Sequence, residues 1–571
     1  MSPGAPGGPG GPGGPGGPAD PRVTRWRATA ATATAELLEL EPEAATGLGH
    51  RAGDDRLDDL SEAGRDDRRR RLAQARDAVD DLDADALGPD DAVDLELLRT
   101  ALDRRLLALD VVRRHEWDPL AWLPVDALHG LLTRDTTPLP DRLRALAARC
   151  DAVPERLAQA RATVERPSRV HAETARDRSA AAARMLDEEL PPLLAAAGAQ
   201  GGPGLPATVG TAARRAAEAL REHAAALHAQ LDRADGDPRL GPEVFRAALH
   251  LTLDTALPLE EVTRRARAHL ERVTDELHEA AARHLGAAAR GLDRDETVRA
   301  ALADVARAHP GTATLVPRAR AAYEEAREAT RRLGLVTVTD DPVEVQVMPE
   351  SRRGVAVAYC DAPGPLETGG STVFAVAPPP AAWPAERVAS FLREYNDAML
   401  VTLAVHEGVP GHVHQLAVAR RHRAPTAVRA LCPSGSLVEG WAVHAERLLA
   451  EAGHGGLPVR LQQLKMQLRM TLNALLDAGV HAEGMAEAEA LDLLTTRGFQ
   501  EEGEAVGKWR RALLTSTQLS TYFTGWTELD DLLADLAAAR GGTLPSYDEV
   551  LAHGSPPPRH LRTLLGLESQ T

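Results

Sequence analysis

Cysteine is scarce in this chain. Cys150, Cys360 and Cys432 are the only three among 571 residues. They form no C-x-x-C pair and no even-numbered framework, so the sequence encodes neither a disulfide scaffold nor a zinc site built from thiolates. This usage fits a reducing compartment.

Long apolar runs are also missing. No stretch approaches the roughly 20 residues that an apolar helix needs to cross a bilayer. The N-terminus has neither the basic segment nor the apolar segment of a secretory signal. We therefore expect a cytoplasmic protein that does not act at a membrane.

Positive charge is in the minority, with 66 Lys and Arg against 84 Asp and Glu and a formal net charge of −18. Affinity for nucleic acids comes mostly from clustered Lys and Arg, so we expect neither DNA nor RNA as a partner. With 43% apolar and 26% charged residues, the composition is that of a folded globular protein, and a chain of this length can bury a large core. Disorder throughout is excluded.

The composition divides the chain. Residues 1–21 are almost entirely Gly and Pro without a long collagen-type repeat, which predicts a disordered leader. Residues 22–333 are rich in Ala, Leu, Arg, Glu and Asp, and segments such as 212–233 and 259–284 repeat apolar residues every three or four positions. That spacing is typical of amphipathic helices, so we expect an N-terminal helical region.

Residues 334–571 are predicted to combine a small β-sheet with a helical metal-site region. Helical periodicity resumes at residue 385 and continues to 540. The expected fold class is mainly α with a small inserted sheet, and we expect this region to form one catalytic unit with the N-terminal helices. Short β-branched segments predict strands at 336–338, 343–347, 355–359 and 372–376.

Three of the 20 histidines, His406, His412 and His414, lie within nine positions. Imidazole is a common zinc ligand, and a glutamate directly after the first histidine, here Glu407, can act as a general base. In the H-E-x-x-H pattern the two histidines are four residues apart and converge from one face of a helix. The cluster therefore predicts a metal site; for His414 alone, a surface or packing role is the simpler interpretation.

The spacing departs from that pattern. The fourth position after His406 is Pro410, and His412 comes two residues later, about 240° around an uninterrupted helix. Pro410 cannot donate a hydrogen bond to the His406 carbonyl and disfavours a helical conformation at Val409, while Gly411 accepts almost any backbone angle. We expect a kink or bulge at this Pro-Gly pair that returns His412 to the side of His406.

A third ligand has to come from another element, and Glu439 is the best candidate. It follows His412 by 27 residues, which leaves room for a loop and a returning helix. Two histidines and one glutamate leave an open position for water. We therefore predict that His406, His412 and Glu439 bind Zn²⁺, with another divalent metal as an alternative. Glu446, two turns after Glu439, is either a hydrogen-bond partner of a ligating imidazole or a plain carboxylate on the helix face.

These motifs resemble a bacterial family catalogued as domain of unknown function 885. The resemblance is carried by H-E-x-x-P-G-H at 406–412 and E-G-W-A at 439–442. Residues 518–525 are also similar to the family's Q-A-L-S-Y-x-x-G. That family is regarded as distantly similar to helical zinc metallopeptidases of the thimet oligopeptidase and Taq carboxypeptidase kind. The resemblance implies a large helical, cleft-containing, metallopeptidase-like fold.

The resemblance also implies roles. The three predicted ligands would hold the metal, Glu407 would be the general base, and Tyr522 would donate a hydrogen bond to an oxyanion. We expect His481 to point into the cleft as a further catalytic residue. Three positions depart from the family pattern, with Val413 in place of a second histidine, Asn473 in place of arginine and Ser516 in place of proline.

The function predicted from these residues is a metal-dependent hydrolase that cleaves peptide or amide bonds in short substrates through a metal-activated water. Two alternatives stay open. One is a metal-dependent enzyme acting on a small molecule, such as an amidohydrolase or a lyase, because Asn473 and Ser516 alter the pattern and a fold does not fix chemistry. The other is a helical peptide-binding scaffold without turnover.

Overall fold

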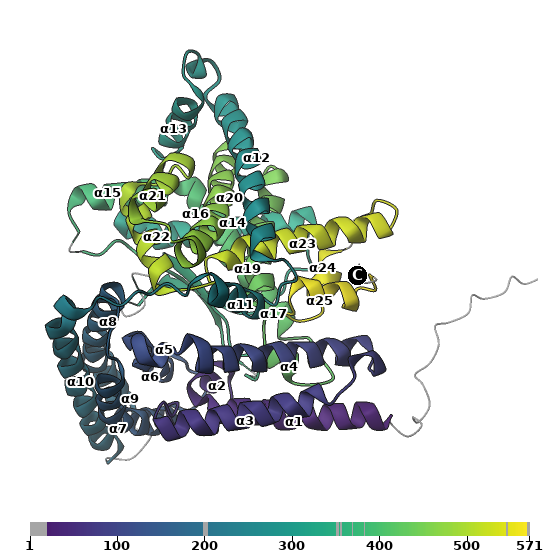
Figure 1. The fold of residues 1–571 in the computed structure, drawn as a ribbon. Helices are drawn as coiled ribbons and strands as arrows, with labels where there is room; N and C mark the ends of the chain where they lie inside the picture. The colour runs from purple at the N-terminus through teal and green to yellow at the C-terminus, as the bar shows by residue number, and fades with distance from the viewer. Residues whose placement is uncertain are drawn as a thin grey trace, which may run out of the picture.

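The computed structural model describes residues 20–197, 204–349, 353, 357–367, 369–381, 383–543 and 546–567. The first helix begins at Pro21. The leader predicted at residues 1–21 therefore lies, apart from its last two residues, outside the described residues. The fold is mainly α with a small sheet, as the sequence predicts (Figure 1).

The helices at the bottom of Figure 1 form the first layer, in which α1, α3 and α4 pack side by side. The Ser61 hydroxyl caps α3 by accepting a hydrogen bond from the Gly64 N–H. The buried Trp26 donates a 2.9 Å hydrogen bond to Asp91, which links α1 to α4. The helices of this part are α1 (Pro21–Leu40), α2 (Pro42–Leu48), α3 (Glu62–Asp80), α4 (Pro89–Leu107), α5 (Arg114–Trp117) and α6 (Val125–Thr133).

Long helices at the left of Figure 1 form a separate bundle, in which α10 packs against both α7 and α8. The amphipathic segment predicted at 212–233 lies mostly in α10, whose alanines at three- and four-residue spacing are buried in the bundle core. Small side chains allow this close approach of helices. The bundle contains α7 (Leu139–Thr163), α8 (Arg169–Glu188), α9 (Leu190–Ala197) and α10 (Leu205–Gln230).

The next four helices join the N-terminal region to the rest of the chain. The segment predicted at 259–284 is α12, which packs against α20, while α14 packs against α16. The apolar faces of α12, α13 and α14 lie in the same core as those of α16, α20 and α23, so this part of the N-terminal region shares a large core with residues 334–571. These helices are α11 (Pro242–Leu253), α12 (Leu259–Leu285), α13 (Arg294–Val305) and α14 (Leu315–Leu333).

The second half of the chain contributes the central helices, of which α19 packs against α23 and α20 against both. This arrangement buries α20 along most of its length. The helices are α15 (Ala385–Glu394), α16 (Asp397–Glu407), α17 (His412–Ala419), α18 (Val428–Leu431), α19 (Gly435–Glu451), α20 (Gly456–Ala478), α21 (Glu487–Asp492), α22 (Glu502–Leu514), α23 (Ser520–Ala539), α24 (Tyr547–Leu551) and α25 (Pro558–Leu564).

The sheet has three strands in the order β1-β3-β2, formed by β1 (Val343–Val347), β2 (Ala358–Asp361) and β3 (Thr372–Val376). β1 pairs with β3 in parallel, and β2 pairs with β3 antiparallel. The strands predicted at 343–347 and 372–376 are confirmed, whereas the one predicted at 355–359 starts later among the described residues. The strand predicted at 336–338 is wrong: Val336 packs with Leu437 and Trp441, and the Thr337 N–H donates to Asp548 rather than to a strand.

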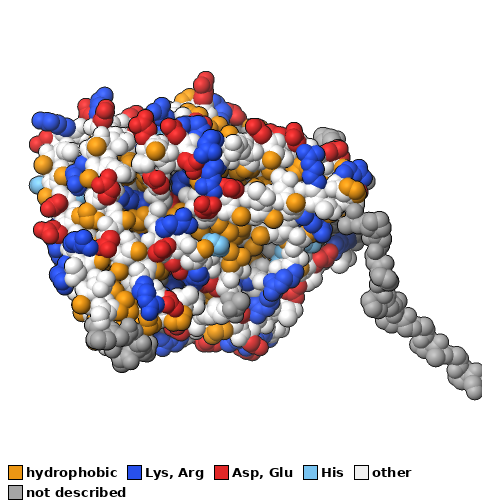
Figure 2. Space-filling view, turned by 90° about the horizontal axis from the view of Figure 1, so that it is seen from below, with side chains coloured by type: hydrophobic (Ala, Val, Ile, Leu, Met, Phe, Trp, Pro, Cys, Tyr) orange, Lys and Arg blue, Asp and Glu red, His pale blue; other side chains and the backbone are white. Residues whose placement is uncertain are grey.

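The surface of the first layer carries mixed charge. On the described part of the face drawn in Figure 2, Lys and Arg side chains are interspersed with Asp and Glu. No extended positive surface is visible among the described residues of that face, in keeping with the acidic net charge. Among the described helices, none is long and apolar enough to cross a membrane.

A buried carboxyl between α11 and α23 should make stability depend on pH. Burial raises the pKa of Glu528 to about 7, although the Thr255 hydroxyl donates a 2.7 Å hydrogen bond to it. Because its pKa is raised in the folded protein, the carboxyl contributes stability at pH values below the pKa that it has in the unfolded chain. This contribution is lost as the pH rises through about 7. Glu528→Gln should therefore gain stability relative to the native protein between pH 5 and pH 8, by up to about 3 kcal/mol, measured by denaturant unfolding at both pH values. Parallel pH profiles for the two proteins would contradict this.

Candidate metal centre

The helix that carries His406 ends directly after Glu407. The Asn396 side chain caps its start by accepting hydrogen bonds of 3.1 Å from the Ala398 and Met399 N–H groups. A new helix, α17, begins at His412. The predicted break at Val409-Pro410-Gly411 is therefore confirmed, as a complete interruption rather than a kink.

Two glycines make this turn possible. A Cβ on Gly411 would lie 2.0 Å from the His406 carbonyl oxygen, and one on Gly408 would lie 2.2 Å from the Ala404 carbonyl oxygen. The Gly411 N–H donates a 3.1 Å hydrogen bond to Val405 and so folds the turn back onto the end of α16. Any larger residue at either position would have to displace backbone atoms, which would also displace His412.

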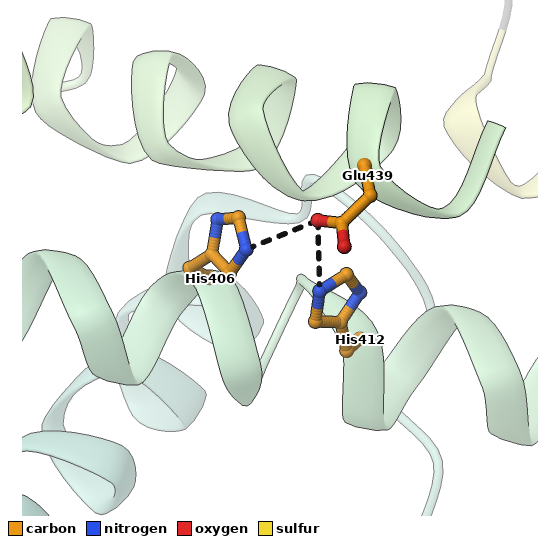
Figure 3. A group of neighbouring side chains, drawn as sticks. All are labelled: His406, His412 and Glu439. Atoms are coloured by element: carbon orange, nitrogen blue, oxygen red, sulfur yellow. Dashed lines mark ion pairs between the residues drawn. The ribbon is translucent and has the colours of Figure 1, made fainter. Parts of the chain in front are cut away.

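The turn brings the predicted ligands together. Figure 3 shows the carboxylate of Glu439, on α19, between the two imidazole rings. Its Oε2 lies 3.5 Å from Nε2 of His406 and 3.5 Å from Nε2 of His412. The ring centroids are 4.7 Å apart with planes at 83°. One ligand atom from each residue lies within 4.8 Å of the others.

These separations fit a metal ion. Ligand atoms about 2.1 Å from a tetrahedral zinc ion lie roughly 3.4 Å from one another. The two 3.5 Å separations match that spacing and exceed the length of a strong N–H···O hydrogen bond. The Glu439 side chain is 22% exposed, so solvent reaches the cluster. Oε2 of Glu439 and Nδ1 of His412 are buried without a hydrogen bond to any described residue, and a cation would satisfy the carboxylate oxygen.

Glu446 orients His406. Its Oε1 lies 2.6 Å from His406 Nδ1, and its side chain is almost completely buried. A hydrogen bond from Nδ1–H to a carboxylate leaves Nε2 as the nitrogen that can bind a metal and makes it more basic. Of the two roles predicted for Glu446, the geometry favours hydrogen bonding to the ligand.

The cluster attracts positive charge. Burial opposes protonation of His406, but the adjacent carboxylates of Glu439 and Glu446 outweigh it and raise the pKa of His406 well above its ordinary value. Burial would likewise raise the pKa of Glu439, but the adjacent imidazoles of His406 and His412 hold it far below its ordinary value. The three side chains therefore favour a cation among them, either a proton or a metal ion.

Close packing of α19 and α23 places Tyr522 beside the cluster. A Cβ on Gly525 would lie 1.8 Å from the Ser436 carbonyl oxygen, and one on Gly440 would lie 2.4 Å from a Gly525 backbone atom. The helices therefore touch through their backbones next to Glu439. Burial and then the charge of Glu439 raise the pKa of Tyr522, so its hydroxyl stays protonated and can donate a hydrogen bond.

Glu407 is buried at the end of α16, and its carboxylate forms no hydrogen bond or ion pair with any described residue. Helix α16 packs against β2, and burial and then the charge of Glu407 raise the pKa of Cys360 on that strand. A carboxylate without a protein partner is free to accept a proton from water.

His481 lies elsewhere, in the π-helical turn η8 (Gly479–Glu483). Its Nε2 lies 2.9 and 2.8 Å from the Ala512 and Thr515 carbonyl oxygens, and its Nδ1 accepts a 3.4 Å hydrogen bond from the Leu240 N–H. The ring also stacks on Phe245 at 5.4 Å. Because both nitrogens are occupied by backbone groups, the structure does not bring His481 to the cluster, and its position gives the predicted catalytic role no support.

His414 has a packing role. It is fully buried, neither ring nitrogen has a partner among the described residues, and burial lowers its pKa to about 4.

The structure adds two residues that sequence reasoning missed, Arg511 and Gln518, each with a side-chain nitrogen 3.4 Å from the Tyr522 hydroxyl. Gln518 opens the segment that resembles the family motif, whereas Arg511 gave no sequence signal.

The fold and cluster define a mainly α protein with a His-His-Glu site between three helices. The chain belongs to the bacterial protein family of unknown function DUF885, whose sequence model matches residues 42–565. No curated protein compared with the chain matches it.

Two solved structures of unknown or unstated function are similar. One, from Shewanella oneidensis, is 26% identical with a TM-score of 0.79 and covers 95% of this chain and 99% of its own. The other, from Colwellia psychrerythraea, is 15% identical with a TM-score of 0.77, covers 96% and 100%, and shows the fold alone. The description of each of those two proteins is "putative lipoprotein". The cytoplasmic location expected for this chain stays a prediction.

Proposed function

We propose that the protein is a metal-dependent hydrolase that cleaves peptide or amide bonds in short substrates. The observation that carries this proposal is the convergence of His406, His412 and Glu439, with both Nε2 atoms 3.5 Å from one carboxylate oxygen. A site of two histidines and one glutamate leaves a coordination position open, which is typical of catalytic rather than structural zinc.

His406, His412 and Glu439 would hold a divalent ion, with Zn²⁺ favoured by the ligand types. Such an ion, when bound, polarises a substrate carbonyl and makes water more acidic. Glu446 would keep His406 oriented through the 2.6 Å contact to Nδ1.

The remaining chemistry falls to two side chains. Glu407 would accept the proton of the attacking water and pass it to the leaving amine, because its carboxylate has no partner among the described residues. Tyr522 would donate its hydroxyl proton in a hydrogen bond to the carbonyl oxygen as negative charge develops there. Its raised pKa supports this role, because the donor stays protonated at neutral pH.

The test combines metal content with an activity screen. The purified full chain should bind about one zinc ion, measured by inductively coupled plasma mass spectrometry, and should cleave members of a library of short peptides. Removing the metal with a chelator should abolish cleavage, and zinc should restore it. The proposal fails if the chain retains no metal after incubation with zinc, or if the loaded protein cleaves no amide bond in the library.

A further inference from the structure

Helix α20 carries a buried polar stripe next to the metal centre. Lys465, Arg469, Asn473 and Asp477 follow one another at four-residue spacing, so they share one face of the helix. Lys465, Asn473 and Asp477 are at most 8% exposed. Asp477 accepts hydrogen bonds from the Ser520 N–H and hydroxyl, so the stripe ends at the start of α23, the helix that carries Tyr522.

Helix α22 packs against α20 and adds two more cations, Lys508 and Arg511. They are three residues apart and therefore lie on the same face of α22. Lys508 is only 8% exposed. Burial, and then the charges of Arg469 and Arg511, lower the pKa of Lys508 well below its ordinary value, so without an anion beside it this side chain favours its neutral amine form.

Carboxylates pair with the cations of α20, but Lys508 and Arg511 on α22 have no such partner among the described residues. Lys465 donates hydrogen bonds of 2.9 and 2.7 Å to Glu394, and Arg469 contacts Glu504. Among the described residues, Lys508 has neither a hydrogen bond nor an ion pair, and the guanidinium of Arg511 contacts the neutral groups of Gln518 and Tyr522 but no carboxylate. An anion bound here would pair with Arg511 and would favour the protonated form of Lys508, which burial otherwise disfavours.

The charge of Arg511 lies directly beside the proposed catalytic group. The Arg511 guanidinium is 3.4 Å from the Tyr522 hydroxyl, and Tyr522 in turn senses the charges of Glu439 and His406. Successive residues of a peptide are about 3.8 Å apart. A substrate whose carbonyl oxygen meets Tyr522 would therefore present the group one residue further along to Arg511 and Lys508.

We propose that Lys508 and Arg511 bind the free α-carboxylate of the residue that follows the scissile amide, so that the protein removes the C-terminal residue from short peptides. This inference rests on the proposed function. The planar guanidinium of Arg511 suits the two carboxylate oxygens, and Lys508, one turn earlier on α22, would add a second positive charge once the carboxylate is bound. Substrates with a C-terminal amide lack this anion and leave both side chains unpaired.

The first test compares two matched substrates, N-acetyl-dialanine with a free carboxylate and the same peptide as its C-terminal amide. The native, metal-loaded chain should cleave the free acid with a kcat/KM at least 30-fold higher than the amide. Lys508→Met and Arg511→Met should each reduce that preference by 10-fold or more, mainly through the KM of the free acid. Equal cleavage of both substrates by the native chain would overturn the inference.

Arg510→Met is the matched control. Arg510 is on the same helix but contacts Glu173 and Thr174 of α8, away from the metal centre. This variant should keep the full preference for the free acid. If it loses the preference as Lys508→Met does, a general effect on α22 explains the result and the inference is wrong.

The second test separates this inference from the proposed function. Isothermal titration of the Glu407→Gln chain with the two peptides measures binding without turnover. Tighter binding of the free acid, weakened by Arg511→Met, supports the carboxylate site even if the native chain cleaves nothing, in which case the hydrolase proposal alone fails. Equal binding of both peptides overturns the carboxylate site, whatever the activity. Arg511 is partly exposed, so its variant keeps the test open if Lys508→Met does not fold.

Discussion

Glu407→Gln is expected to lower kcat/KM for amide hydrolysis by about 10²–10⁴-fold while leaving bound zinc unchanged. Glutamine has nearly the same shape as glutamate but cannot accept the proton of the attacking water. Because Glu407 is not one of the three converging ligands, its loss should not weaken the metal site. The measurements are kcat/KM on the best peptide of the library and zinc content of the same preparation.

The result distinguishes a base from a ligand. If Glu407→Gln loses zinc together with activity, Glu407 belongs to the metal site and the proposed division of roles is wrong. If activity persists within about threefold of the native value, another group accepts the proton. Tyr522→Phe serves as a second comparison, because removal of a single hydrogen-bond donor to an oxyanion typically costs about 10²–10³-fold in kcat.

Glu439→Gln should weaken zinc binding by more than 100-fold, and Glu446→Gln by about 10–100-fold. Glu439 offers a charged oxygen 3.5 Å from both imidazole nitrogens, and glutamine replaces that charge with a neutral amide. Glu446 acts one step further away, through its 2.6 Å contact with Nδ1 of His406. Competition with a chromophoric zinc chelator measures both dissociation constants.

The geometry requires a larger loss of zinc affinity for Glu439→Gln than for Glu446→Gln. Glu451→Gln is the control, because Glu451 is exposed at the C-terminal end of the same helix, and it should bind zinc as the native chain does. Equal affinities for Glu439→Gln and the native chain would remove Glu439 from the ligand set. A larger loss for Glu446→Gln than for Glu439→Gln would exchange the roles of the two carboxylates.

Local patterns predicted much of the helical architecture. Apolar spacing indicated α10 and α12, and Pro410 with Gly411 indicated an interruption between the two histidines, because both signals depend on residues within one or two turns. The segment at 336–338 shows the limit. Its β-branched residues favour a strand, but Val336 instead packs against Leu437 and Trp441. A strand needs a partner from elsewhere in the chain, and propensity alone does not supply one.

The candidate site, like the fold, could be predicted only in part from the sequence. The spacing of His406, Glu407 and His412 suggested a metal site with Glu439 as its third ligand, and the resemblance added Tyr522. The sequence also suggested His481, whose ring nitrogens the fold uses to hold backbone groups. A histidine's role depends on what its two nitrogens meet, and for His481 those partners are residues 240, 512 and 515.

The sequence by itself determined the helical composition, the interrupted helix and the identity of the side chains able to bind a metal, because each is written in neighbouring residues. Only the tertiary structure decided that Glu439 meets both imidazoles, that Glu446 holds Nδ1 of His406, and that Arg511 lies beside Tyr522 without a carboxylate partner among the described residues. Those contacts depend on the crossing of α16, α19, α20, α22 and α23, which the packing of one shared core fixes.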